Sequence, residues 1–220
     1  MLPDLLVDAI RPLSFRGKLR LLNTLIPHSG ERTVEAHGCR FRLDLSEFAE
    51  RHVYFGTYEP EESNLARRLL QPGGTFVDAN AGIGFSTALA VSRVGPTGQI
   101  LAVEASTMSY LRLERLVRDN HLNQVVLFHG TLGARHQAPV TTLDALASRH
   151  GLVTIDLLKL AGGDLSLLAG AARLLAQQRI RAVLCRLDST DTRMLDQLSV
   201  LGFRQKRQFG DSHFFQAGGS

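Results

Sequence analysis

From residue 75 to residue 87 the chain reads Thr75-Phe76-Val77-Asp78-Ala79-Asn80-Ala81-Gly82-Ile83-Gly84-Phe85-Ser86-Thr87. A short apolar run ends in an acid, a loop with two glycines follows, and the next residues have helical character. This order predicts a pocket of nucleotide size at the carboxyl end of a parallel strand. The loop departs from the usual pattern at one position, because Asn80 stands where such loops commonly carry their first glycine.

Strands and helices alternate from this stretch to the end of the chain. Apolar runs predict strands at residues 75–78, 99–104, 125–129, 153–160 and 180–187. Helical periodicity predicts helices at 85–94, 108–120, 142–150, 165–177 and 192–201. Residues 203–209 and 213–216 are expected to form an antiparallel pair. The pattern predicts a doubly wound, Rossmann-like α/β sheet that is mostly parallel. The C-terminal hairpin is what separates methyltransferase-like sheets from ordinary dinucleotide-binding ones.

The N-terminal part of the chain has a different pattern. Residues 1–30 read as helical with a break at Pro12, and residues 33–45 read as a β-hairpin with its turn at His37-Gly38. A further helix is expected at 59–70. We therefore predict an N-terminal helical and hairpin cap at 1–45 and a methyltransferase-like domain at 46–220.

The composition restricts the class of protein. The chain has 44% hydrophobic residues, no apolar run long enough to cross a membrane and no signal-peptide pattern. Cys39 and Cys185 match no metal-binding spacing, so we expect reduced thiols, no bound metal and a cytoplasmic location. The net charge is +4, but Lys and Arg are spread along the chain without interleaved aromatics, which disfavours nucleic-acid binding.

The charges around the loop indicate the kind of ligand. Gly82 and Gly84 let the backbone approach a ligand, and Asp78 at the strand end repels phosphate but attracts an ammonium group. Glu104 ends the next strand, about 20 residues after the loop, where a carboxylate can accept hydrogen bonds from both ribose hydroxyls. These acids favour S-adenosylmethionine, which has a zwitterionic methionine end. An NAD loop would carry a third Gly or Ala where this chain has Thr87.

From about Phe41 to Gln216 the chain resembles FkbM-type class I methyltransferases. The matching pieces are Phe55-Gly56-Thr57-Tyr58-Glu59-Pro60-Glu61, the stretch from Pro72 to Gly84, Val103-Glu104-Ala105-Ser106, the helix end from Leu116 to Asn123, Thr141-Thr142-Leu143-Asp144, Ile155-Asp156-Leu157-Leu158-Lys159-Leu160 and Leu167-Leu168-Ala169-Gly170-Ala171. The resemblance implies S-adenosylmethionine-dependent O-methylation of a sugar or polyketide-like hydroxyl.

The resemblance also implies where the cofactor binds. It suggests that the site is lined by Tyr58, Asp78, Gly82, Glu104 and Ser106. We add residues in and beside the same loops, which are Ala79, Asn80, Gly84, Ala105 and Thr131.

Two departures from the family pattern bear on catalysis. The loop has Asn80 in the glycine position, and Asn tolerates left-handed backbone geometry better than most residues. The segment after Lys159 is shorter than in the family and lacks the acid expected at the strand end. Asp164 is the nearest substitute, although it can instead cap the helix that follows. We assign Lys159 and Asp164 as the catalytic candidates, with His129 and His213 as other possible bases.

The sequence therefore predicts an S-adenosylmethionine-dependent O-methyltransferase that acts on a small-molecule, sugar or polyketide-like hydroxyl. The altered loop and the missing acid after Lys159 leave open a non-catalytic interaction module with the same fold. An RNA methyltransferase is the third interpretation, favoured by the isoelectric point of about 9.5 and disfavoured by the scattered charge.

Overall fold

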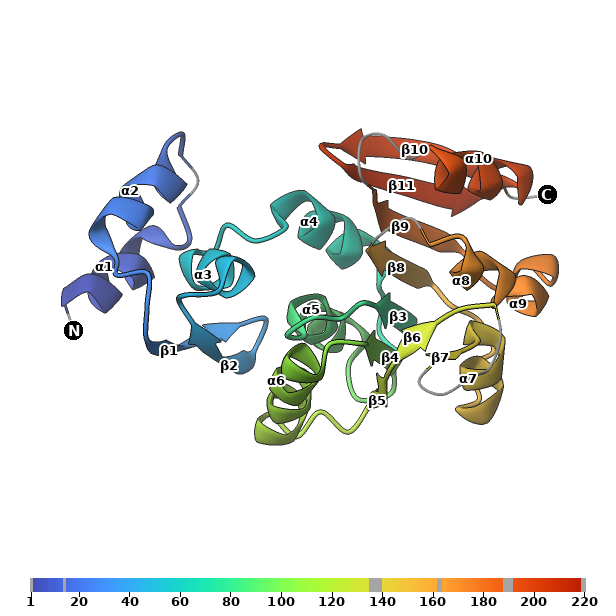
Figure 1. The fold of residues 1–220 in the computed structure, drawn as a ribbon, viewed down its shortest axis with the longest axis horizontal. Helices are drawn as coiled ribbons and strands as arrows, with labels where there is room; N and C mark the ends of the chain where they lie inside the picture. Colours follow the sequence, from blue (N-terminus) through green and yellow to red (C-terminus); the bar gives the residue numbers. More distant parts are fainter. Residues whose placement is uncertain (1, 14, 135–139, 162–163, 188–191, 219–220) are drawn as a thin grey trace. The chain divides into compact units, whose positions relative to one another are not determined.

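The computed structural model describes residues 2–13, 15–134, 140–161, 164–187 and 192–218 (Figure 1). The chain divides into two compact units, Met1–Pro60 and Glu61–Ser220. The dividing point lies after the predicted boundary at residue 45, because the helix at Phe48–Phe55 contacts the N-terminal hairpin.

The N-terminal unit contains two short helices, a hairpin and a third helix. Its elements are α1 (Leu2–Ile10), α2 (Lys18–Leu25), β1 (Glu31–Ala36), β2 (Cys39–Asp44) and α3 (Phe48–Phe55). The predicted turn is confirmed, since His37 and Gly38 have φ angles of 55° and 75°, as a two-residue hairpin turn requires. Helix α3 was not predicted.

The second unit is built on one seven-stranded sheet. Its strands are β3 (Thr75–Ala79), β4 (Gln99–Glu104), β5 (Val125–His129), β8 (Leu157–Ala161), β9 (Ala182–Arg186), β10 (Phe203–Phe209) and β11 (Ser212–Ala217). The strand order is β10-β11-β9-β8-β3-β4-β5, and β11 is antiparallel to both of its neighbours. The predicted α/β fold, with a mostly parallel sheet and a C-terminal antiparallel hairpin, is confirmed.

Helices cover both faces of this sheet (Figure 1). They are α4 (Pro60–Leu69), α5 (Phe85–Val94), α6 (Thr107–Asp119), α7 (Leu143–Arg149), α8 (Ser166–Ala169), α9 (Ala172–Ala176) and α10 (Arg193–Val200). On one face Phe76 and Ile100 pack with Leu65 of α4 and Leu89 of α5. On the other face the strands pack against α7, α8, α9 and α10. A two-strand bridge, β6 (Thr131–Leu132) with β7 (Val140–Thr141), follows β5.

One predicted helix is divided. The expected helix at 165–177 breaks at Gly170, where an added Cβ would lie 2.0 Å from the backbone oxygen of Gly133. A second helix then starts because the Asp144 carboxylate accepts hydrogen bonds from the backbone N–H groups of Arg173 and Leu174. A long-range acceptor therefore overrides the helical periodicity of this segment.

A polar cluster joins α4 to the C-terminal part of the sheet. Glu62 Oε1 accepts hydrogen bonds from Ser212 Oγ at 2.6 Å and Arg186 Nη2 at 2.9 Å. Burial raises the pKa of Glu62, but the hydrogen bonds from Ser212 and Arg186 outweigh burial and hold the pKa below its ordinary value. A lowered folded-state pKa means that this carboxylate stabilises the fold above the ordinary Glu pKa and less as the pH falls through the folded-state pKa.

We expect Glu62→Gln to lower the free energy of unfolding near neutral pH by about 1–2 kcal/mol. The difference in free energy of unfolding between the variant and the unchanged protein should shrink as the pH falls toward about 3. Urea unfolding at several pH values measures this difference. Glu61→Gln is the matched control, because Glu61 is exposed on the same helix. Equal losses for both variants at every pH would contradict the assignment.

Candidate functional site

The loop after β3 turns sharply and is tied to β4. Asn80, Gly82 and Gly84 have φ angles of 73°, 58° and 87°. The backbone N–H groups of Asn80 and Ala81 both donate to the Val103 carbonyl, at 2.9 and 2.8 Å. Asn80 therefore makes the left-handed turn itself, as expected from the tolerance of asparagine for this geometry.

The two glycines of the loop meet different surroundings. A Cβ on Gly84 would lie 2.5 Å from Leu116 Cδ2 and 2.7 Å from Leu113 Cδ1, so this glycine lets the loop pack on α6. A Cβ on Gly82 would meet no atom within 4 Å. The open side of Gly82 is thus the place where a ligand can approach the backbone.

Glu104 connects the loop to the start of α6. Its side chain is largely buried, and Oε2 accepts a hydrogen bond from the Gly82 N–H at 2.7 Å. Oε1 accepts one from the Ser106 N–H at 2.7 Å, and Ser106 in turn caps α6. Because each carboxylate oxygen has a second lone pair, Glu104 keeps capacity for two more donors, such as two ribose hydroxyls.

Asp78 lies beneath the loop and helix α5. Its side chain is 1% exposed, and Oδ2 accepts a hydrogen bond from Thr87 Oγ1 at 2.9 Å. Lys159 on the neighbouring strand β8 is its register partner, and Lys159 Nζ donates to Ser86 Oγ at 2.6 Å. The Ser86 and Thr87 hydroxyls were not predicted as site residues. Their place in the first turn after an acid-ended strand was the available signal.

A small cavity opens at the carboxyl ends of β3 and β8. Its volume is about 140 Å³, and it is lined by Ala79, Asn80, Thr131, Leu132, Leu160, Asp164, Leu167 and Met194. Four predicted residues meet here, namely Ala79, Asn80, Thr131 and Asp164. Small-molecule sites commonly measure roughly 300–1,000 Å³, so this cavity can enclose only part of a nucleoside-sized ligand.

Asp164 lies between helix α8 and the cavity. Its Oδ1 accepts the Ser166 N–H at 2.8 Å at the start of α8, and the residue is one of those that line the cavity. Residues 162–163, which belong to the shortened segment after Lys159, lie outside the described residues.

The other candidate bases lie elsewhere. His129 is exposed and stacks on Tyr110, with ring centroids 4.5 Å apart. His213 is buried on β11 in register with Cys185, which donates a hydrogen bond to its carbonyl. Burial raises the pKa of Cys185 to about 12, which makes its thiol a poor nucleophile. Tyr58 belongs to the N-terminal unit.

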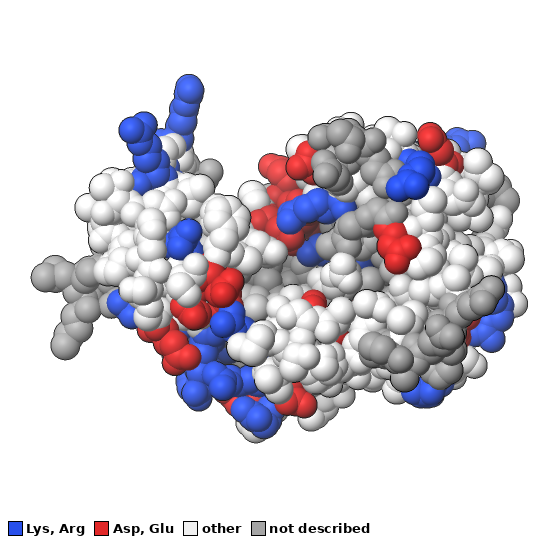
Figure 2. Space-filling model, viewed as in Figure 1, with Lys and Arg blue, Asp and Glu red and all other residues white. Residues whose placement is uncertain are grey.

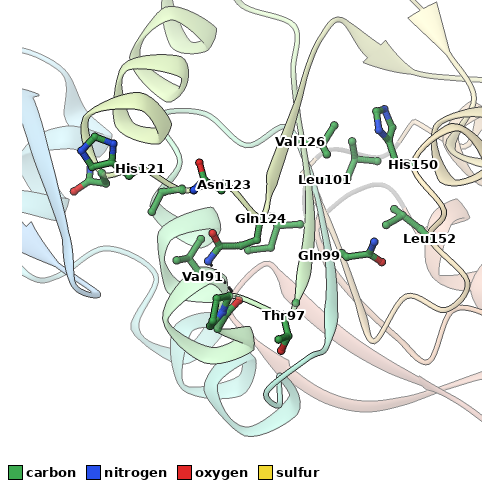
Figure 3. Close-up of a pocket in the computed structure, with 16 residues that line it drawn as sticks. Val91, Thr97, Gln99, Leu101, His121, Asn123, Gln124, Val126, His150 and Leu152 are labelled. Atoms are coloured by element: carbon green, nitrogen blue, oxygen red, sulfur yellow. Dashed lines mark hydrogen bonds between the residues drawn. The ribbon is translucent and has the colours of Figure 1, made fainter.

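A larger hollow lies at the opposite edge of the sheet (Figure 3). It has a volume of about 870 Å³ and is lined by the amino ends of β4 and β5 and by nearby loops. Its lining includes the polar side chains of Gln99, Asn123, Gln124 and His150 (Figure 3). Among the described residues this lining holds no Asp, Glu, Lys or Arg. The larger hollow and the acidic groups therefore lie at different edges of the sheet. We take the edge with Glu104 as the candidate site.

Other described features set limits on the site. Within the described residues, no group of three or more His, Cys, Asp or Glu side chains is placed to hold a metal ion. The helices of this part of the chain also lack the length and apolar character needed to cross a membrane.

Comparison with protein families gives one match. Residues 33–137, just under half of the chain, match the model of the TRM5/TYW2 methyltransferase domain. This match covers the loop, Glu104 and Thr131. A search of curated proteins finds no significant match.

Solved structures with the same fold are methyltransferases of several kinds. A Clostridium thermocellum protein assigned as an rRNA methylase aligns with a TM-score of 0.52 and 11% identity, over 73% of this chain and 96% of its own. An rRNA methylase from Streptococcus thermophilus aligns with a TM-score of 0.51 and 12% identity, over 72% and 95%. The methyltransferase FkbM from Methylobacillus flagellatus aligns with a TM-score of 0.52 and 16% identity, over 77% and 55%.

At these identities the structural matches establish the fold and nothing finer. The sheet order and these matches agree on a Rossmann-like α/β fold, and residues 33–137 are in addition similar to a methyltransferase domain. The matched model is not the FkbM family that the motifs suggested, so the FkbM resemblance is confirmed only at the level of the fold.

Proposed function

We propose that this chain is an S-adenosylmethionine-dependent methyltransferase that methylates a hydroxyl of a small-molecule or glycosidic acceptor. The observation that carries the proposal is the Glu104 carboxylate, which is fixed by the Gly82 and Ser106 N–H groups beside the open face of the loop. That arrangement suits a ribose, and the matched methyltransferase model covers the same residues.

The cofactor is proposed to extend across the carboxyl ends of β3 and β4. Its ribose would bind Glu104, with Ala105 and Ser106 beside the nucleoside and the open side of Gly82 facing the sulfur. Asp78 would act on the ammonium group through its field, because its carboxylate is buried. Ala79, Asn80 and Thr131 would close the small cavity around the bound molecule. Gly84 would support the loop on α6. Tyr58 is a proposed cofactor residue on the family resemblance alone.

The chemistry needs alignment and one proton acceptor. The acceptor oxygen attacks the sulfonium methyl carbon, the carbon–sulfur bond breaks with its electrons left on sulfur, and the products are the methyl ether and S-adenosylhomocysteine. The hydroxyl proton passes to a base. Asp164 is the proposed base, because its carboxylate lines the cavity next to Asn80.

RNA is the second candidate acceptor, and a specific observation favours it. The matched family model is that of TRM5/TYW2, and RNA methylases are among the proteins with this fold. The excess of basic residues lies entirely at 61–220, with 17 Lys and Arg against 13 Asp and Glu. On the viewed face of that unit, however, basic and acidic side chains are interspersed among the described residues (Figure 2). This pattern favours a small acceptor over a polyanion.

Transfer of a labelled methyl group separates these functions. The full chain is incubated with methyl-labelled S-adenosylmethionine and either a small-molecule extract or total RNA, with Asp164→Asn as the matched control. We expect label in the small-molecule fraction and a loss of roughly 100-fold or more for Asp164→Asn. Label in RNA alone would show that the acceptor is RNA and not a small molecule. Cofactor binding without label in either fraction would indicate a non-catalytic module.

A further inference from the structure

Lys159 occupies an unusual place for a cation. It follows Leu157 and Leu158 on β8, inside the parallel sheet, and it pairs in register with Asp78 on β3. Phe76 and Leu157 pack with residues of α5 on one face of the sheet. Asp78 and Lys159 each follow one of them by two positions on the same strand, so their side chains lie on that same face. A cation within an apolar strand costs stability unless anions or hydrogen-bond acceptors surround it.

Ser86 fixes the position of the Lys159 ammonium group. The 2.6 Å hydrogen bond to Ser86 Oγ brings Nζ to the first turn of α5, next to the loop that carries Gly82 and Gly84. The side chain is partly exposed, whereas the neighbouring Asp78 is buried. An ammonium group has three donors, and the bond to Ser86 uses one of them.

Lys159 is absent from the lining of the cavity that Asp164 borders. Its ammonium group is directed to helix α5, on the side of the methionine end of the proposed cofactor, and not to the region proposed for the acceptor. This geometry argues against the catalytic role that the sequence predicted for Lys159.

We propose that Lys159 binds the carboxylate of the cofactor's methionine moiety and thereby selects a ligand with an intact amino-acid end. The proposal rests on the proposed function. Lys159 and Asp78 then form a pair of opposite charges that matches a zwitterion, with the carboxylate on Lys159 and the ammonium group in the field of Asp78. The N–H groups at the start of α5 support an anion at the same place.

Decarboxylated S-adenosylmethionine tests this directly, because it keeps the adenosine, sulfonium and ammonium groups and lacks only the carboxylate. Calorimetry with the full chain compares its dissociation constant with that of S-adenosylmethionine. We expect the unchanged protein to prefer S-adenosylmethionine roughly 10- to 100-fold, the contribution of a charge-assisted hydrogen bond. In Lys159→Met the preference should fall to within about threefold, while Lys159→Arg should retain most of it.

Lys206→Ala is the matched control, because it removes a lysine from the exposed edge strand β10 of the same sheet. It should leave the preference unchanged. A preference that persists in folded Lys159→Met, or one that is absent from the unchanged protein, would overturn the proposal. If Lys159→Met does not fold, Ser86→Ala serves instead, and its preference should fall several-fold; an unchanged value would overturn the proposal. Binding of neither ligand to the unchanged protein would refute the proposed function itself, which is a distinguishable result.

Discussion

Glu104→Ala is expected to weaken S-adenosylmethionine binding by about 100-fold or more. The change removes the acceptor that fixes the N–H groups of Gly82 and Ser106, and it removes the proposed acceptor for the ribose hydroxyls. Hydrogen bonds to a charged group contribute about 1.5–3 kcal/mol each, and loss of two of them corresponds to at least a 100-fold change in affinity. Isothermal titration calorimetry measures the effect.

Glu104→Gln is the matched control for shape. It keeps one carbonyl oxygen as an acceptor but presents an NH₂ group toward the other donor, so we expect an intermediate loss of roughly tenfold. In each variant, the affinity for S-adenosylhomocysteine should fall by the same factor as the affinity for S-adenosylmethionine, because the ribose is common to both ligands. Wild-type affinity in Glu104→Ala would contradict the placement of the ribose.

Gly84→Val is expected to cause the largest loss of stability. A Cβ at this position meets Leu113 and Leu116 at 2.7 and 2.5 Å, and the φ angle of 87° strains a branched residue in addition. Overpacking and backbone strain each cost about 1–3 kcal/mol, so the free energy of unfolding should fall by roughly 3–5 kcal/mol. Thermal unfolding should show a decrease in Tm of roughly 10 °C or more.

Gly82→Ala is the control from the same loop. Its φ angle is also positive, but its Cβ would meet no atom within 4 Å. The loss of stability should therefore be about 1 kcal/mol, while ligand binding should suffer more than stability, because the methyl group occupies the open side of the loop. Equal destabilisation by the two variants would show that packing on α6 is not the reason for glycine at position 84.

Most of the fold was predictable because local patterns and the tertiary structure agree. The strands at 99–104, 125–129 and 203–209 and the helix at 85–94 were predicted with the observed bounds. One segment that differs is governed by distant groups. Asp144 and Gly170 divide the helix at 165–177 through contacts with Arg173 and Gly133, which no local pattern reveals.

Prediction of the site was limited in a similar way. The acids Asp78 and Glu104 were recognisable because they lie at the carboxyl ends of strands, and the turn at Asn80 followed from the backbone preference of asparagine. The direction of a long side chain does not follow from such patterns. Lys159 was predicted as a catalytic group, but its hydrogen bond to Ser86 depends on how α5 packs on the sheet, which only the structure supplies.

The most direct measurement is a crystal structure of the protein with S-adenosylhomocysteine. We expect the ligand at the carboxyl ends of β3 and β4, with ribose hydroxyls within hydrogen-bond distance of the Glu104 carboxylate and the carboxylate of the amino-acid end on Lys159 Nζ. Ligand bound in the hollow at the amino ends of β4 and β5, or a ribose that does not contact Glu104, would contradict it.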